Sequence, residues 1–324
     1  YSSAASDVYK RQAHRLEQEA TKAYTIEVTH KNLESFLKNM PQGMGALIYL
    51  LSNMEDEFQV EDVISKLRDE TQFNLKMMRD HFESLPQVTE SFFKKLPSFN
   101  PAYSNELPFP KKNELKDSLA AAILNHAESL HFILTNLYNL YMPYISRWEN
   151  RDFKGDSQKL KAWAVFETNF GVLEKLAAAF KHYLELPNDW STVLRYSDYD
   201  GYAIESSPID VGKRIHDELL IMSSSVVFTS ATLGNASGDS GVQGVEWMTG
   251  YTYLPAEKRF KSGLFLDAVY DYKNNSKVFL CADTRNISDP LFVPDLMQKV
   301  NPLIARLGGR ALLLFSSRLR FEAA

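Results

Sequence analysis

The sequence predicts an α/β protein in which a large helical block precedes the strand-forming part of the chain. From residue 13 to about 186, apolar residues recur at spacings of three and four, which is the period of packed amphipathic helices. After Pro187, short apolar runs alternate with helical segments, as they do in α/β folds. The 324 residues are 44% hydrophobic and 24% charged, a globular composition with enough length for two or more domains.

Composition also excludes several classes of protein. Cys281 is the single cysteine, so no internal disulfide or cysteine-based metal site can form within these residues, which suits a reducing compartment. No run approaches the roughly 20 apolar residues of a membrane span, and the first 25 lack the apolar centre of a secretory signal. We therefore expect a cytoplasmic protein without a membrane partner. The net charge of -5 neither indicates nor excludes a local basic groove for DNA.

The helical block is expected to contain three long helices, at residues 59–85, 112–141 and 157–186. A proline-rich stretch separates the first two, because proline disfavours helix in the residue before it. The seven histidines show no spacing typical of metal ligands, and His126 and His131 would face different sides of a helix. We expect a bundle whose histidines are ordinary core or surface residues.

The first strands are expected around Asp200-Gly201, a turn dipeptide that separates two strand-like runs. A helix should follow, with Ser207 as N-cap, Pro208 at its first position and Asp210 in a capping box. The apolar run at 225–229 then predicts a strand buried on both faces of a parallel sheet.

The last segments continue the alternation of strands and helices. Residues 276–282 predict a strand with Cys281 inside it as a buried small hydrophobe. Residues 289–309 predict a helix with a kink or break at Pro302, and residues 310–317 predict a further buried strand.

Hydroxyl side chains follow two of these strands, at the edge where α/β sheets bind ligands. Thr229, Ser230 and Thr232 stand at the carboxyl end of the strand at 225–229, where they could position a water or relay the state of a phosphate. A second group follows the last strand and could hold a DNA phosphate through hydroxyls, backbone N–H groups and a cation: Ser316, Ser317 and Arg318. An ordinary Ser/Thr turn or helix cap is the alternative interpretation at both places.

These motifs resemble those of the DinG/XPD branch of superfamily-two helicases. "VVFTSATL", with the "SSPIDVGKRIHDELL" before it, resembles motif III, and "GGRALLLFSSRLRF" resembles motif IV. The helical block stands where this family inserts its arch domain, and Ala13-His14 with the helix after it resembles the end of a DEAH box. The resemblance implies an α/β P-loop (RecA-like) motor fragment with a large inserted all-α arch domain.

The resemblance also implies a function, namely ATP-dependent 5′-to-3′ DNA helicase activity in DNA repair, by a monomer in the bacterial nucleoid. It assigns coupling of ATP hydrolysis to DNA movement to Ser230, Ala231 and Thr232, and makes His14 a DEAH-box remnant. It assigns nucleic-acid binding to four residues: Thr229, Ser316, Ser317 and Arg318. The implied partners are single-stranded, forked or displaced-strand DNA and ATP with Mg²⁺; a [4Fe-4S] cluster, where the family carries one, lies upstream of the DEAH box.

The expected domain organisation follows the same resemblance. Residues 1–12 resemble a translated sequencing adapter and are expected to be a non-native tail, and residues 13–24 are the DEAH-box remnant. Residues 25–188 form the arch, 189–275 the remainder of the first motor domain, and 276–324 the start of the second.

Essential motor parts are missing from these 324 residues. There is no GxxxxGK[ST] sequence to hold ATP, and Arg11 and Gln12 stand where the family has Asp and Glu. Motif VI is also absent, so we expect no cofactor-binding residues, no metal ligands and no activity from the chain alone. Two other interpretations stay open: a DinG-type motor associated with a nuclease, and a non-catalytic helical adaptor whose motif likenesses are chance.

Overall fold

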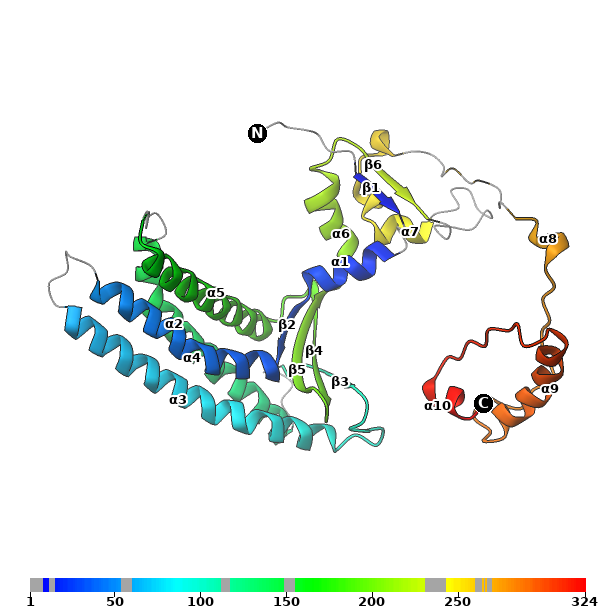
Figure 1. Ribbon diagram of the computed structural model, residues 1–324, viewed down its shortest axis with the longest axis horizontal. Helices are drawn as coiled ribbons and strands as arrows, with labels where there is room; N and C mark the ends of the chain where they lie inside the picture. Colours follow the sequence, from blue (N-terminus) through cyan, green and yellow to red (C-terminus); the bar gives the residue numbers. More distant parts are fainter. Residues whose placement is uncertain are drawn as a thin grey trace. The chain divides into compact units, whose positions relative to one another are not determined.

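The computed structural model describes residues 8–11, 15–53, 60–111, 117–148, 155–230, 243–259, 264, 266 and 270–324. The chain divides into two compact units, Tyr1–Gly263 and Leu264–Ala324, each described below by itself. Its architecture is mixed α/β with a predominance of helix (Figure 1).

Four long helices form the main body of the first unit: α2 (His30–Ser52), α3 (Val60–Phe93), α4 (Ser118–Trp148) and α5 (Ser157–Glu185). Helix α2 packs on α3 and α5, and α4 packs on the same two helices, so the four enclose one apolar core (Figure 1). The three predicted long helices are thus confirmed, with α3 and α4 each extending beyond the expected end.

Local sequence explains where two of these helices begin and end. Thr29 caps α2 by accepting a hydrogen bond from the backbone N–H of Asn32, and the side-chain oxygen of Asn32 accepts one from the backbone N–H of Thr29. Asp156 caps α5 by accepting from the N–H groups of residues 158 and 159, and Leu186 ends that helix in the left-handed region at φ 45°.

An antiparallel sheet packs against the helices in the strand order β2-β5-β4-β3. The strands are β2 (Ile26–Thr29), β3 (Asn105–Pro108), β4 (Trp190–Ser197) and β5 (Gly201–Pro208). The predicted hairpin at Asp200-Gly201 is confirmed as β4–β5, with Gly201 at φ 71° in the turn.

The hairpin belongs to the same core as the helical block. Leu194, Tyr202 and Ile204 are fully buried and form part of the hydrophobic cluster that fills the bundle. The expected domain boundary at residue 188 therefore falls just before two strands that complete this core. Burying one face of a sheet on a helical layer explains why the strands and helices form one unit.

The expected helix cap at Ser207 is wrong. Ser207 and Pro208 end strand β5, opposite Ser191 and Trp190, because the hairpin ladder extends through both residues. Helix α6 (Val211–Ile215) begins after them, and Asp210 caps it by accepting a hydrogen bond from the N–H of Lys213 at 2.9 Å. The chain continues as a π-helical turn, η3 (His216–Leu220).

Strand β6 (Val226–Thr229) pairs in parallel with β1 (Val8–Arg11), which lies within the segment expected to be a non-native tail. The prediction of a strand at this place is confirmed, but burial on both faces is wrong, since Val227 is 44% exposed. Among the described residues, parallel pairing is limited to these two strands, so a multi-stranded RecA-like sheet is not seen there. Helix α1 (Leu16–Tyr24) contacts α6 and β5.

The second unit contains three helices in its described part: α8 (Tyr272–Asn275), α9 (Phe292–Arg306) and α10 (Arg318–Glu322). The helix predicted at 289–309 is confirmed as α9, and it continues through Pro302 without a break.

The two strands predicted in the second unit are wrong. Residues 276–282 and 310–317 adopt no regular structure, and Leu280 and Leu314 are 89% and 86% exposed. Cys281 is exposed as well, against the expectation of a buried side chain. A strand needs a neighbour for its backbone N–H and C=O groups, and the described part of this unit contains no strand to supply one.

Candidate functional site

The first group of predicted site residues lies at the carboxyl end of strand β6. Thr229 is the last residue of β6 and stands in register with Arg11, the last residue of β1. Because the strands are parallel, both carboxyl ends meet at one edge. Thr229 is exposed at this edge, and Ser230 follows it, half-buried. His14, Ala231 and Thr232 lie outside the described residues.

A small second core supports this edge. Val226 and Phe228 of β6 pack on Val211, Ile215 and Leu220, which come from α6 and η3. Apolar side chains of α1 pack on the same cluster. Thus the helix that follows Ala13-His14 in sequence and the helix that precedes β6 share one core.

A hydrogen bond joins the end of α1 to the π-helical turn. Tyr24 donates its hydroxyl to a carboxylate oxygen of Glu218 at 2.8 Å. Partial burial and this bond to an anion both raise the pKa of Tyr24, in that order of size. The phenol therefore stays a donor at neutral pH.

The backbone of helix α6 lies very close to that of α7 (Gln243–Met248) and of Gly250, just after α7. A Cβ atom on Gly212 would lie 1.9 Å from the carbonyl oxygen of Trp247, and one on Gly250 would lie 2.1 Å from that of Gly212. Gly250 also has φ 76°, a conformation that other L-residues rarely adopt. Only glycine fits at both positions.

Polar side chains around this contact were not predicted as site residues. Tyr253 donates a short hydrogen bond to Asp210, the cap of α6, and this bond raises the pKa of Tyr253. The His216 ring lies 5.8 Å from that of Tyr253, and His216 Nδ1 lies 2.8 Å from Asp217 Oδ1. The sequence segment "GKRIHDELL" is part of the motif III resemblance. It did not reveal the π-helical turn, a feature often found at functional sites, because such turns have no sequence signature.

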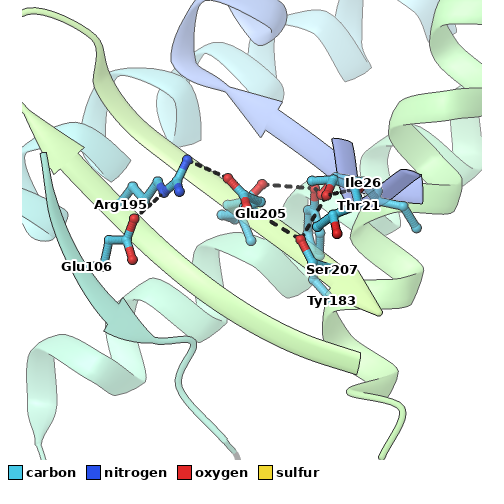
Figure 2. Close-up of polar contacts among 9 residues, drawn as sticks. Thr21, Ile26, Glu106, Tyr183, Arg195, Glu205 and Ser207 are labelled. Carbon is cyan, nitrogen blue, oxygen red and sulfur yellow. Dashed lines mark hydrogen bonds and ion pairs between the residues drawn. The ribbon is translucent and has the colours of Figure 1, made fainter. Parts of the chain in front are cut away.

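A polar network connects the sheet of the helical body with α1 (Figure 2). Arg195 on β4 bridges two carboxylates, with Nε 2.8 Å from Glu106 on β3 and Nη1 2.5 Å from Glu205 on β5. Ser207 Oγ donates to Glu205 at 3.4 Å and lies 2.8 Å from the hydroxyl of Thr25, just after α1.

Two hydroxyls, one in this network and one beside it, donate to three backbone carbonyls. Thr25 donates to the carbonyl oxygen of Thr21 at 2.6 Å. Tyr183 on α5 donates to the carbonyl oxygens of Ile26 and Ile204, and its burial raises the pKa of its phenol (Figure 2). Helix α1 is therefore attached by hydrogen bonds to the sheet that completes the helical body.

The second group of predicted site residues lies in the second unit, before and at the start of α10. Ser317 Oγ accepts a hydrogen bond from the backbone N–H of Arg320, and the guanidinium of Arg320 donates to Ser316 Oγ at 2.8 Å. Arg318 is highly exposed and pairs with Glu322 at 2.8 Å. The structure thus adds Arg320, four residues after Ser316, to the three residues that the sequence indicated.

Other features of the first unit limit the chemistry. In the described ranges, no three His, Cys, Asp or Glu side chains converge as metal ligands. Lys94 and Lys95, near the proline-rich stretch, are paired with Glu90 and Asp117 at 2.5 and 2.6 Å. Such pairs fit a solvated surface better than a phosphate contact.

No helix in the described part of the chain has the length and apolar character needed to span a membrane. Comparison with protein-family models and with curated proteins finds no significant match to this chain.

Proposed function

We propose that this chain is part of an ATP-dependent DNA helicase similar to the DinG/XPD family, which moves 5′ to 3′ along single-stranded DNA. The observation that supports this most is the core that α1 shares with α6 and β6. Helix α1 follows Ala13-His14 in sequence, and Ser230-Ala231-Thr232 follows β6. A motor that couples a DEAH box to motif III needs the segments that carry them to pack together, as α1 and β6 do.

In this proposal the helical body is the arch that frames the DNA strand. Ser316, Ser317 and Arg318 bind DNA phosphates, with Arg320 holding Ser316 in place through its 2.8 Å hydrogen bond. The network from Glu106 to Thr25 fixes the arch to α1, the helix after the DEAH-box remnant.

The residues of this chain do not fit ATP with Mg²⁺, nor an iron–sulfur cluster. The 324 residues lack a P-loop, and a cation and an amide at Arg11 and Gln12 supply neither the carboxylate oxygens that Mg²⁺ prefers nor a base for water. A single cysteine cannot hold a [4Fe-4S] cluster. The chain alone should therefore bind DNA without hydrolysing ATP.

Binding of single-stranded DNA tests the proposal on the chain as it is. Fluorescence anisotropy with a labelled oligothymidine should show binding that weakens as salt rises, because phosphate contacts release counterions. Arg318→Ala should weaken it and reduce the salt slope, whereas Arg306→Ala, at the end of α9, should change neither. Equal effects of the two variants, or no salt-sensitive binding, would remove the proposed DNA contact.

The coupling role is tested in a chain completed with a P-loop and the acidic pair. Single-stranded DNA should stimulate its ATPase, and Thr232→Ala should keep hydrolysis while losing unwinding. Undiminished unwinding by this variant would contradict the motif III assignment. If the sequence before Ala13 in the parent gene contains neither P-loop nor Asp-Glu, the helicase proposal fails and a non-catalytic adaptor is favoured.

The same motor joined to a nuclease domain is a variant of this proposal. An assay of the parent protein for DNA cleavage, with and without Mg²⁺, distinguishes a motor that has a nuclease domain from one that lacks it. Cleavage by the parent would indicate the nuclease-associated form.

A further inference from the structure

Two histidines from different helices face one another at the edge of the helical core. His81 on α3 and His126 on α4 have their Nδ1 atoms 2.9 Å apart, and their rings are inclined at 75°. Both side chains are half-buried, so they are fixed by packing and still accessible to small solutes. Neither residue belongs to the motifs used in the proposed function.

Buried apolar side chains flank the pair on both helices. Met78 and Leu85 on α3 lie about one turn either side of His81, and both are fully buried. Ile123 and Leu130 flank His126 on α4 in the same way, and both are fully buried.

A second contact shows how these two helices run. The hydroxyls of Thr71 and Tyr141 lie 2.5 Å apart. From this contact to that of His81 with His126, the residue number rises along α3 and falls along α4. The helices are therefore antiparallel, and they hold the two imidazoles at a fixed separation.

The separation matches that of two ligands on one metal ion. Imidazole nitrogens bind divalent metals at about 2.0–2.1 Å, so two bonds at 90° place the nitrogens about 2.9 Å apart, and two tetrahedral bonds about 3.3 Å apart. The observed 2.9 Å fits neighbouring positions of a tetragonal or octahedral ion. Among first-row divalent ions, Cu²⁺ and Ni²⁺ combine that geometry with affinity for imidazole.

We propose that His81 and His126 form a two-histidine site for Cu²⁺ or Ni²⁺ that bridges α3 and α4, with water in the remaining positions. Binding replaces the hydrogen bond between the rings. The proton on the donating Nδ1 moves through solvent to Nε2 of the same ring, so both Nδ1 lone pairs face the metal and no net proton is lost from neutral rings. The described residues supply no third side-chain ligand, which is why water completes the shell.

Copper titration followed by electron paramagnetic resonance tests this site on the wild-type chain. With less than one equivalent of Cu²⁺, the spectrum should show two equatorial imidazole nitrogens. His81→Asn and His126→Asn should each leave one nitrogen and weaken binding by about 100-fold, because the second bond of a chelate forms intramolecularly. His131→Asn, which removes another imidazole from α4, should bind as wild type does.

The copper titration tests the two-histidine site independently of the helicase proposal. A wild-type spectrum with a single nitrogen, or equal weakening by all three variants, would overturn it, because copper would then occupy scattered histidines. Circular dichroism of each variant checks its fold, and the wild-type nitrogen count stands even if a variant unfolds. DNA binding and its salt dependence should be the same for His81→Asn and wild type.

Discussion

The guanidinium of Arg195 lies 2.5 Å from the carboxylate of Glu205, across the β4–β5 hairpin. In the strand register Arg195 is opposite Ala203, so Glu205 is its diagonal neighbour on the same face. The Glu205 side chain is only 19% exposed, which strengthens this pair relative to one in open solvent. Since Glu205 also accepts from Ser207, the pair joins the sheet to the hydroxyls beside α1.

Replacing Arg195 with methionine should destabilise the first unit by about 1–2 kcal/mol, because it leaves the largely buried carboxylate of Glu205 without its cation. We expect a smaller loss of stability than for a fully buried ion pair, because the Arg195 side chain is 36% exposed and solvent screens its charge. Urea unfolding measures it. The exposed Arg79→Met on α3 is the control, for which a change within about 0.5 kcal/mol is expected; equal losses would show that the network contributes nothing.

Replacing Gly250 with alanine should open the contact between α6 and the segment after α7. The new Cβ would meet the carbonyl oxygen of Gly212 at 2.1 Å, and the left-handed φ adds strain, so a loss of about 2 kcal/mol or more is expected. Amide hydrogen exchange should quicken at residues 211–220.

Gly45→Ala, on α2, is the matched control. A Cβ there meets nothing within 4 Å, and alanine favours helix by about 0.5–1 kcal/mol over glycine. We expect unchanged exchange at 211–220 and equal or higher stability. Similar losses in both variants would contradict the close packing of Gly212 on Gly250.

The hydrogen bond between Thr71 and Tyr141 should show strong coupling in a double-mutant cycle. Both groups are buried, so Tyr141→Phe alone leaves the Thr71 hydroxyl unpaired and should cost about 1–3 kcal/mol. Thr71→Val together with Tyr141→Phe should recover part of that loss, because no buried polar group is left alone. Strict additivity of the two changes would argue against the bond.

Burial also raises the pKa of Tyr141 to about 12. Burial raises the pKa of Tyr183 and Tyr202 as well, so spectrophotometric titration should show fewer tyrosines ionising near pH 10 than composition implies. Tyr141→Phe should leave the number that ionise near pH 10 unchanged, because Tyr141 is not among them. Ionisation of Tyr141 near pH 10 in the folded chain would contradict its buried position.

The fold was predictable where the signal is local and periodic. Helices α3, α4 and α5 each repeat an apolar stripe over about eight turns, so their period outweighs any single residue. The β4–β5 hairpin was predictable because Asp200-Gly201 supplies a turn signal between two strand-like runs.

The missed elements depend on partners distant in sequence. Strands β2 and β3 have four residues each and contain charged or proline residues, which are tolerated because both are edge strands of the sheet. Conversely, the apolar run at 310–317 has strand propensity but no strand beside it in the described part of the second unit. Ser207 shows the same effect: its local sequence favours a helix cap, but pairing with Ser191 on β4 places it in a strand.

The candidate site was predictable only in part for the same reason. Hydroxyls after a strand are visible locally, so Thr229 and Ser230 could be named. Arg195, Glu106 and Glu205 come from three strands and become a network only when those strands pair. Tyr253 reaches Asp210 across 43 residues, and no spacing rule indicates such a contact.

Four histidines should make the stability of the first unit depend on pH. Burial lowers the pKa of His30, His81, His126 and His182 below the ordinary 6.5. The unfolded chain then binds more protons than the folded chain just below pH 6.5, so stability falls as pH decreases through that value. For His126, the neighbouring His81 lowers the pKa further, because two charged imidazoles would repel.

Urea midpoints measured between pH 7.5 and 5.5 should fall steadily, before most carboxylates titrate. His81→Asn/His126→Asn should flatten this dependence, since it removes two of the four groups. His216→Asn is the control for the loss of a histidine, because His216 lies in η3, outside the helical body. A pH slope as steep in the double variant as in the wild type would mean that the two imidazoles titrate alike in folded and unfolded chains.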